Sequence, residues 1–375
     1  MSSGGISQLV ALGAQDAFLV GNPEVSFFQS VYRQHTNFSQ VVSRQLIQGN
    51  PSSGGMSSVR FERAGDMLGY VYISPICTGN NGTPTTYQTV NWSNVINYVE
   101  FYIGGQLVDR QDSVFTEFLA PNLLAQNHTK STESYNHGGF GKSSFFYPLR
   151  FWFCENTQCA LPLVALQYHD VEVRIYWSTN LLSSVADPAD PFAPSRIVNF
   201  ELYTQYIYLD DNERKYMTDK THNMLITQVQ YMNPTNTKNM PIVFNHPIKY
   251  LCATNGTSTS SNVGSSSVAL TSNTNMIIVQ INGTDISDYK YACPHFTSAP
   301  AFYNVPFSGS NTDSYFLMPF CIDTSKFQPT GSLNFSRLDS VRIVSQSQNI
   351  GTTIYGVNYN ILKIQNGMGG LMYSN

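Results

Sequence analysis

The chain has 375 residues, of which 42% are hydrophobic and 13% aromatic, and this is enough for two ordinary domains with separate cores. Charged residues make up 12%, about half of the roughly 25% usual in soluble globular proteins, so the surface relies on uncharged polar groups that suit packed interfaces. The net charge of −4, without a long Lys/Arg cluster, argues against direct nucleic-acid binding, and the 23 Tyr and 23 Phe exclude a disordered chain.

Residues 1–24 are predicted to form an N-terminal arm that ends at the turn signal Gly21-Asn22-Pro23. One weakly amphipathic helix, interrupted at Gly13, is expected from the apolar residues Ile6, Leu9, Val10, Ala17 and Phe18. The arm lacks the cationic start of a secretory signal, and no apolar run approaches the roughly 18 residues of a membrane helix. We therefore expect a soluble protein without a transmembrane segment, made in the cytosol and not exported by the ordinary route.

Residues 25–209 are predicted to form a first β-rich unit. Val171 to Trp177 alternates apolar and polar side chains strictly, which is typical of a half-buried strand. Strands are expected at 25–31, 59–63, 67–73, 95–103, 144–153, 171–177 and 198–209.

Residues 210–223 are predicted to link this unit to a second one at 224–375. Asp210 or Asp211 can cap a short helix with acidic residues in its first turn. Strands of the second unit are expected at 224–232, 242–244, 248–252, 276–281, 315–321, 333–344 and 353–364, and exposed loops at 80–86 and 254–275.

The two units repeat one pattern. Asn97–Arg110 is echoed at Asn275–Asp288, each copy being an apolar run, a Gly-Gly or Asn-Gly turn and a return strand. A second pair, ending at Ile175 and Ile343, follows in the same order, and the offsets are 178 (97 to 275) and 168 (175 to 343) residues. Each unit has about eight strands and almost no helix, so we predict an all-β fold of two tandem eight-stranded jelly rolls rather than immunoglobulin sandwiches.

No catalytic, cofactor or metal site is expected. No two histidines have the His-x-His strand spacing of a metal site, and Gly138 to Ser143 precedes an expected strand instead of the helix that a phosphate loop needs. Asp170 and Glu172 are the nearest approach to a pair of catalytic carboxylates, but Arg174 on the same face makes a structural ion pair simpler. The six scattered cysteines are expected to be free thiols.

Asparagine sequons add only weak glycan candidates. Asn81 and Asn255 lie in loops that composition marks as exposed, and they are the possible glycan acceptors. Asn282 is better explained as a turn residue that accepts positive φ before Gly283.

The N-terminal segment Gly5–Phe28, followed by Val31–Phe38, resembles the signature of the major capsid proteins of large icosahedral DNA viruses, with chlorella-virus and iridovirus members nearest. The resemblance continues at 160–170, 208–214, 244–250, 331–337, 358–364 and 366–371, and so spans the chain. It implies a double jelly roll, homotrimeric pseudo-hexagonal capsomers that tile an icosahedral virion shell, and synthesis in the host cytoplasm. It also implies that residues 1–24 contact minor capsid proteins beneath the capsomer, with no cofactor and no enzymatic activity.

The loop before Asn275 and the hairpin at 345–351 are shorter than is usual in the family that the chain resembles, which implies a flatter capsomer. Three alternatives stay open at this point. The chain is a main shell protein or a minor paralogue at special lattice positions; or, in a different class, it is a carbohydrate-binding or carbohydrate-cleaving jelly-roll protein. A receptor-binding surface at 254–275 is compatible with a capsid role.

Overall fold

The structure is a computed structural model that describes residues 3–79, 84–86, 90–130, 145–179, 181, 195–254, 269–307 and 315–374. It consists of two compact units, Met1–Asn37 and Phe38–Asn375. In the first unit, helices α1 (Ser3–Val10) and α2 (Asp16–Val20) lie on either side of Gly13, where the sequence predicted an interruption.

The strand predicted at 25–31 is wrong. These residues form irregular backbone with one turn and bend at 27–29, and Phe27 and Phe28 are 94% and 100% exposed. A strand requires a neighbour that accepts its backbone hydrogen bonds and a core that accepts its apolar face. The described part of the first unit contains no strand that provides either.

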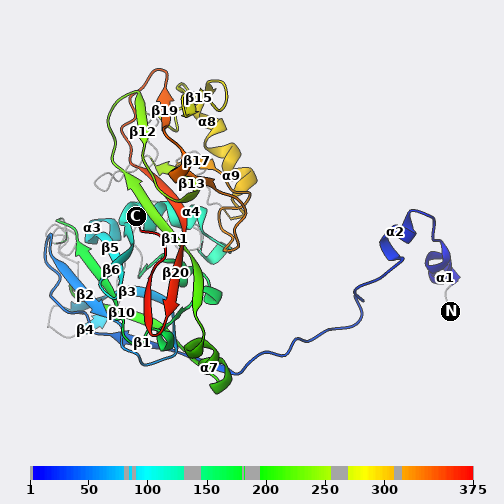
Figure 1. Ribbon diagram of the computed structural model, residues 1–375, viewed down its shortest axis with the longest axis horizontal. Coiled ribbons are helices and arrows are strands. Elements are labelled where there is room, and N and C mark those ends of the chain that lie inside the picture. The colour runs from blue at the N-terminus through cyan, green and yellow to red at the C-terminus, as the bar shows by residue number, and fades with distance from the viewer. Residues whose placement is uncertain are drawn as a thin grey trace. The chain divides into compact units, whose positions relative to one another are not determined.

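The second unit opens with a jelly roll made of two antiparallel sheets (Figure 1). Its strands are β1 (Phe38–Gln45), β2 (Met56–Arg60), β3 (Met67–Gly79), β4 (Pro84–Thr86), β5 (Ile96–Ile103), β6 (Gln106–Asp112), β7 (Tyr147–Pro148), β8 (Leu161–Pro162), β9 (Val171–Trp177) and β10 (Ser195–Leu209). One sheet has the order β1-β10-β3-β4, with β7 and β8 also paired to β3, and the other has the order β2-β9-β5-β6.

A second roll repeats this topology. Its strands are β11 (His222–Met232), β12 (Asn239–Ile242), β13 (Pro247–Thr254), β14 (Met276–Ile281), β15 (Thr284–Asp285), β16 (Lys290–Tyr291), β17 (Tyr315–Pro319), β18 (Leu333–Asn334), β19 (Val341–Ser345), β20 (Ile354–Gln365) and β21 (Met368–Leu371). The orders β11-β20-β13-β17 and β12-β19-β14-β15 repeat those of the first roll, except that β17 takes the place beside β13 that β7 takes beside β3, and β18 pairs with β13 as β8 does with β3. The predicted duplication and the double jelly roll are confirmed.

The repeated hairpin shows why the two sequences agree. Gly104 and Gly105 turn between β5 and β6 with φ of 57° and 80°, and Asn282 and Gly283 turn between β14 and β15 with φ of 51° and 78°. Two successive residues with positive φ make the turn whose twist matches that of the strands, and only Gly or Asn adopts it readily. The turn role predicted for Asn282 is confirmed.

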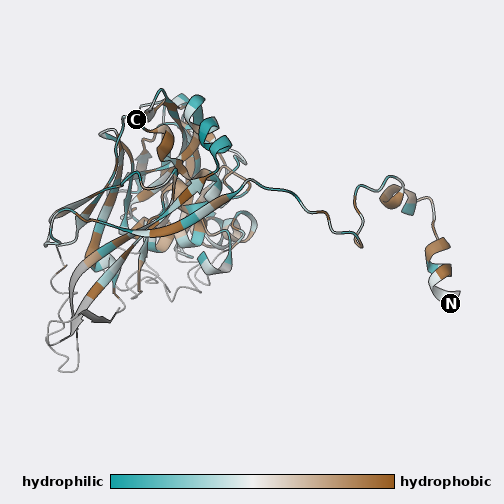
Figure 2. Ribbon diagram, turned by 90° about the horizontal axis from the view of Figure 1, so that it is seen from below, coloured by the Kyte–Doolittle hydropathy of each residue, from teal (hydrophilic) through white to brown (hydrophobic). Residues whose placement is uncertain are grey.

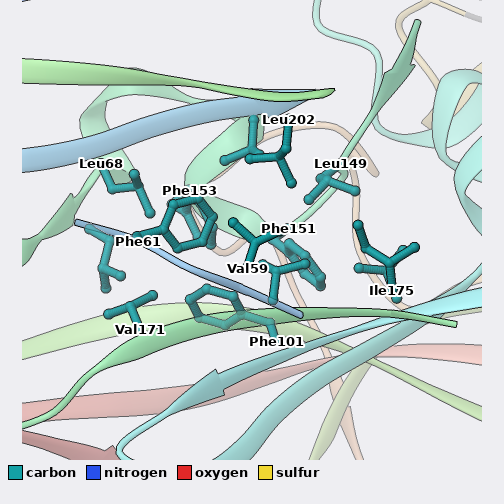
Figure 3. Packing of buried hydrophobic residues seen from close by; sticks show 14 of the residues in the cluster. Val59, Phe61, Leu68, Phe101, Leu149, Phe151, Phe153, Val171, Ile175 and Leu202 are labelled. Atoms are coloured by element: carbon teal, nitrogen blue, oxygen red, sulfur yellow. The ribbon is translucent and has the colours of Figure 1, made fainter. Parts of the chain in front are cut away.

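Each roll has an apolar core, and that of the first roll also takes in Ile226, Leu362 and Ile364 from β11 and β20 of the second roll. In β9 the burial alternates strictly between buried and half-buried residues, as the sequence predicted. Figure 3 shows Phe101 of β5 beside Phe151 and Phe153, and the three rings lie with centroids 5.0–6.0 Å apart. This aromatic packing joins the two sheets of the first roll.

The helices of the second unit are α3 (Trp92–Val95), the π-helix η1 (Phe115–Leu119), α4 (Ala120–Leu123), α5 (Trp152–Glu155), α7 (Asp211–Asp219), α8 (Ala292–His295) and α9 (Ser298–Asn304). Single 3-10 turns occur at η2 (His128–Lys130), η3 (Thr157–Cys159), η4 (Leu163–Ala165) and η6 (Phe335–Arg337). A helix lies where the sequence predicted one after Asp210, namely α7, with Asp210 in the extended N-cap conformation and acidic residues in the first turn.

Two expectations about these helices are wrong. The strand predicted at 144–153 is reduced to β7, because Pro148 has no backbone N–H to donate, and the chain then turns into α5. The expectation of almost no helix fails at η1 and α4, where a short apolar run is buried as a helix instead of a strand. Periodicity alone does not separate these two cases.

Candidate assembly surfaces

The two rolls meet at a helical segment of the first roll. Residues of η1 and α4 pack on the outer face of the β11-β20-β13-β17 sheet of the second roll. Phe118 lies edge-on to Tyr315 with ring centroids 6.3 Å apart, and Phe115 lies 5.9 Å from Tyr355. The residues buried on the sheet side are Tyr250, Cys252, Tyr315, Leu317, Tyr355 and Val357. The joint between the rolls is therefore an apolar core in its own right.

Buried polar groups also cross this joint. The Tyr355 hydroxyl donates to Asp112 Oδ2 at 2.5 Å, and the Val229 N–H donates to Asp109 Oδ1 at 2.9 Å. Burial raises the pKa of Asp109 to about 7, although hydrogen bonds from Val229 and Gln111 act in the opposite direction. Burial also raises the pKa of Asp112.

The strand pairing gives a residue-by-residue correspondence between the rolls. Leu68 pairs with Leu161 in the first roll as Ile248 pairs with Leu333 in the second. Counting along β3 and β13 from these pairs, Tyr70 corresponds to Tyr250, and Tyr72 corresponds to Cys252. In the neighbouring strands, Tyr72 pairs with Pro148 and with Tyr203, as Cys252 pairs with Leu317 and with Tyr355. Phe146 therefore corresponds to Tyr315.

The corresponding faces differ in burial. On the second roll, Tyr250, Cys252, Tyr315 and Leu317 are 0% exposed beneath η1 and α4. On the first roll, Tyr70 is 40% exposed, and Tyr72, Phe146, Pro148 and Tyr203 are half-buried. We call these five residues of the first roll the aromatic groove.

The aromatic groove is hollowed. Two adjoining hollows of about 570 and 400 Å³ share Tyr72 and Phe146 in their walls. The Tyr72 ring stacks on Tyr203 with centroids 5.4 Å apart and meets Phe146 edge-on at 5.6 Å. At the base, Arg150 Nη1 lies 2.9 Å from Glu155 Oε1 and Lys130 Nζ lies 3.4 Å from Glu155 Oε2. The groove thus has aromatic walls, and at its base two cationic side chains share one carboxylate.

Helix α9 of the second roll presents a different aromatic surface. Phe302 and Tyr303 are 79% and 80% exposed, and their rings meet edge-on with centroids 5.1 Å apart. Ala301 on the same helix and Val305 just after it are buried against the joint between the rolls. Small buried apolar side chains therefore hold the helix in place, while the rings of Phe302 and Tyr303 remain exposed to solvent.

The N-terminal unit is apolar and exposed. Every described residue from Gly4 to Asn37 is exposed, and Phe18 is 95% exposed. Figure 2 shows the apolar stretches of α1 and α2 in brown. Among the described residues, no helix is long and apolar enough to cross a membrane. The described part of this unit therefore exposes its apolar side chains without a core of its own.

The described part of the chain contains no group of three or more His, Cys, Asp and Glu side chains that could hold a metal ion. Glu172 Oε1 lies 2.8 Å from Arg174 Nε, and Asp170 pairs with Arg60 at 2.5 Å, so the ion-pair interpretation of these carboxylates is confirmed.

Cys154, Cys159, Cys252, Cys293 and Cys321 are free thiols. Burial raises the pKa of Cys159 to about 12, which makes its thiol unreactive. Asn81, Asn255 and the segment 138–143 lie outside the described residues.

The sequence analysis missed the aromatic groove and α9. A signal was present in the alternation of Tyr70, Tyr72 and Ser74 with the core residues of the same strand, because a half-buried strand usually shows polar residues on its outer face. Tyr70 and Tyr72 place aromatic rings on this outer face instead.

Comparisons with known proteins agree with this architecture. A family profile described as "Major capsid protein N-terminus" matches residues 26–210, and one described as "Large eukaryotic DNA virus major capsid protein" matches residues 213–370. The major capsid protein of Pyramimonas orientalis virus is 31% identical over 99% of this chain and 100% of its own length. That of Paramecium bursaria Chlorella virus 1 is 28% identical, with all of both chains covered.

Two solved structures share the fold. The crystal structure of PBCV-1 VP54, fitted into a reconstruction of the virophage Sputnik, matches with a TM-score of 0.75 and 24% identity over 93% of this chain and 100% of that one. The Faustovirus major capsid protein matches with a TM-score of 0.62 and 10% identity over 94% of each chain. Both comparisons extend over the two rolls together.

Proposed function

Since this chain belongs to the major capsid protein family of large eukaryotic DNA viruses, we propose that three copies of it form a pseudo-hexagonal capsomer of an icosahedral shell. Its role is structural, in the virion capsid, as the names of its relatives indicate. The observation that carries the proposal is the repeated sheet order of the two rolls. Three chains with two similar rolls each present six similar sides, and such a body tiles a surface by near-equivalent contacts.

Several finer features belong to the same proposal. Residues 1–24 act as the arm that contacts minor capsid proteins. The first roll lies within 25–209, with its first strand at Phe38, and the second roll at 224–375 follows the linker 210–223, whose last two residues already belong to β11. The exposed apolar side chains of the arm, among them Leu9, Phe18 and Leu19, support this role, because a free apolar surface calls for a partner. The chain is made in the host cytoplasm and has no catalytic function, and Asn81 and Asn255 are its candidate glycan acceptors.

The native mass of the purified chain tests the proposal. Light scattering is expected to give about 125 kDa, three times the 41.8 kDa of one chain, and negative-stain images of the same fraction are expected to show hexagonal outlines. A stable species of 41.8 kDa at high concentration would contradict the trimer. Glycan-array and hydrolase screens of the same material are expected to be negative.

A further inference from the structure

We propose that helix α9 of one copy covers the aromatic groove of a second copy, with Phe302 and Tyr303 as the anchors. The inference rests on the proposed capsomer and names the surfaces that join its chains. It commits to one occupant of the groove, a second copy of this chain.

The joint between the two rolls is the template. Within one chain, η1 and α4 of the first roll cover the outer face of the second roll and bring Tyr250 and Tyr315 to 0% exposure. The first roll carries the corresponding face with Tyr70 and Phe146, and its hollows show room for side chains from outside. A face with the same topology and similar rings calls for a similar helical cover.

The second roll carries the matching helix at the matching place in the chain. In the first roll, η1 and α4 follow the β5–β6 hairpin and precede β7. In the second roll, α8 and α9 follow the β14–β15 hairpin and precede β17, the strand that corresponds to β7. In Figure 1, α9 lies at the edge of the second roll, on the side away from β12. The first roll's helix is fully buried by the second roll, whereas α9 leaves two rings outside.

The chemistry of the two surfaces is complementary. Phe302 and Tyr303 are large rings on a short helix, and the groove offers Tyr70, Tyr72 and Phe146 as its walls. Aromatic pairs contribute roughly 0.5–1.5 kcal/mol beyond the area they bury, and buried rings anchor most protein interfaces. The described residues of α9 carry no charge, so docking brings no group that competes for the Arg150–Glu155 pair at the base of the groove.

Contacts of this kind assemble head to tail. Each copy has one groove and one α9, and a contact between different surfaces generates a ring when its rotation closes. In a closed ring of three chains, contacts between the two rolls of one chain alternate with contacts between rolls of neighbouring chains. In such a ring a helix covers the aromatic groove of every first roll and the corresponding face of every second roll.

The test uses a double variant of the helix, Phe302→Asp with Tyr303→Asp, and a groove variant, Tyr70→Asp. Each is expected to fall from about 125 kDa to the 41.8 kDa monomer by light scattering, a threefold loss of mass. Phe302 and Tyr303 are about 80% exposed in the single chain, so the helix variant is expected to remain folded, with a thermal unfolding midpoint close to that of the monomeric groove variant. The matched control is Val243→Asp with Ile286→Asp, which adds the same charge at exposed positions elsewhere on the second roll and is expected to leave the trimer intact.

Mixing the two variants tests the pairing itself. The helix variant keeps its groove and the groove variant keeps its helix, so the mixture is expected to form one joint and a dimer of about 84 kDa, twice 41.8 kDa. A mixture that stays monomeric would overturn the head-to-tail pairing. If the helix variant still forms the trimer that the wild-type chain forms, this inference alone is overturned. If the wild-type chain itself is a monomer, the proposed capsomer is overturned.

Discussion

The hydroxyl of Tyr355 in the second roll donates a 2.5 Å hydrogen bond to the carboxylate of Asp112 in the first, and this contact ties the two rolls together at a buried polar point. Asp112 Oδ1 also accepts the Phe115 N–H at 2.8 Å, at the start of the π-helix that packs on the second roll. The Asp112 carboxylate is thus hydrogen-bonded both to the π-helix and to the sheet that this helix covers.

Replacing Tyr355 with Phe is expected to lower the free energy of unfolding by about 1–3 kcal/mol, because a buried acceptor loses its donor. Urea unfolding followed by tryptophan fluorescence measures the change. Tyr250→Phe is the matched control, since the buried Tyr250 hydroxyl has no hydrogen-bond partner among the described residues, and its removal is expected to be neutral or stabilising. Equal losses in both variants would show that the hydrogen bond to Asp112 contributes nothing.

The pKa of about 7 for Asp109 predicts that stability falls as the pH rises from about 4 to 7. The folded state keeps the proton of this carboxyl up to its raised pKa, whereas the unfolded chain releases it near the ordinary value. The stabilisation is therefore complete below about pH 4 and is lost as the pH passes 7, with a slope of up to about 1.4 kcal/mol per pH unit from this group. Unfolding free energies measured from pH 4 to 8 check the slope, and Asp109→Asn is expected to flatten it. An unchanged slope in the variant would assign the pH dependence elsewhere.

Glu117 is 4% exposed, and neither of its carboxylate oxygens has a hydrogen-bond partner among the described residues. Burial raises its pKa well above the ordinary value, so the site disfavours the charged form. Glu117→Met is expected to stabilise the protein by about 1–3 kcal/mol at pH 7, because an unpartnered polar group is removed from the interior.

The control for this change is Glu172→Met, which removes a partly exposed carboxylate that is paired with Arg174. Its effect is expected to lie within about 1 kcal/mol of zero. Calorimetric midpoints of both variants decide the matter, and a destabilised Glu117→Met protein would point to a structural use of this carboxylate.

Deleting residues 1–24 is expected to leave the thermal midpoint and the number of chains per particle unchanged. The reason is that each described residue of this segment is exposed and adds nothing to either roll core. The same truncation is expected to abolish binding to the minor capsid proteins of the virion, measured by co-sedimentation with purified inner-shell components. Retained binding would place the contact elsewhere, and a lowered midpoint would show that the arm supports the fold.

Much of the fold follows from local sequence. The strict alternation from Val171 to Trp177 determines a half-buried strand, and the Gly104-Gly105 and Asn282-Gly283 turns determine two equivalent hairpins, because side-chain period and backbone φ act over a few residues. Their common order along the chain determines that one jelly roll is used twice. No comparable local signal separates the strand expected at 25–31 from an exposed segment, since that distinction depends on whether another strand lies beside it.

Only the tertiary structure decided which apolar surfaces are covered. Tyr70 and Tyr250 occupy the same place in the same strand of the two rolls, and their sequences give no reason to treat them differently. Tyr250 is fully buried because the helical segment of the first roll packs on it, whereas Tyr70 remains 40% exposed because no helix of the second roll packs on it in the described part of the chain. Burial is set by neighbours that are distant in sequence, so residue type and periodicity identify the face, and the packing of whole rolls decides what covers it.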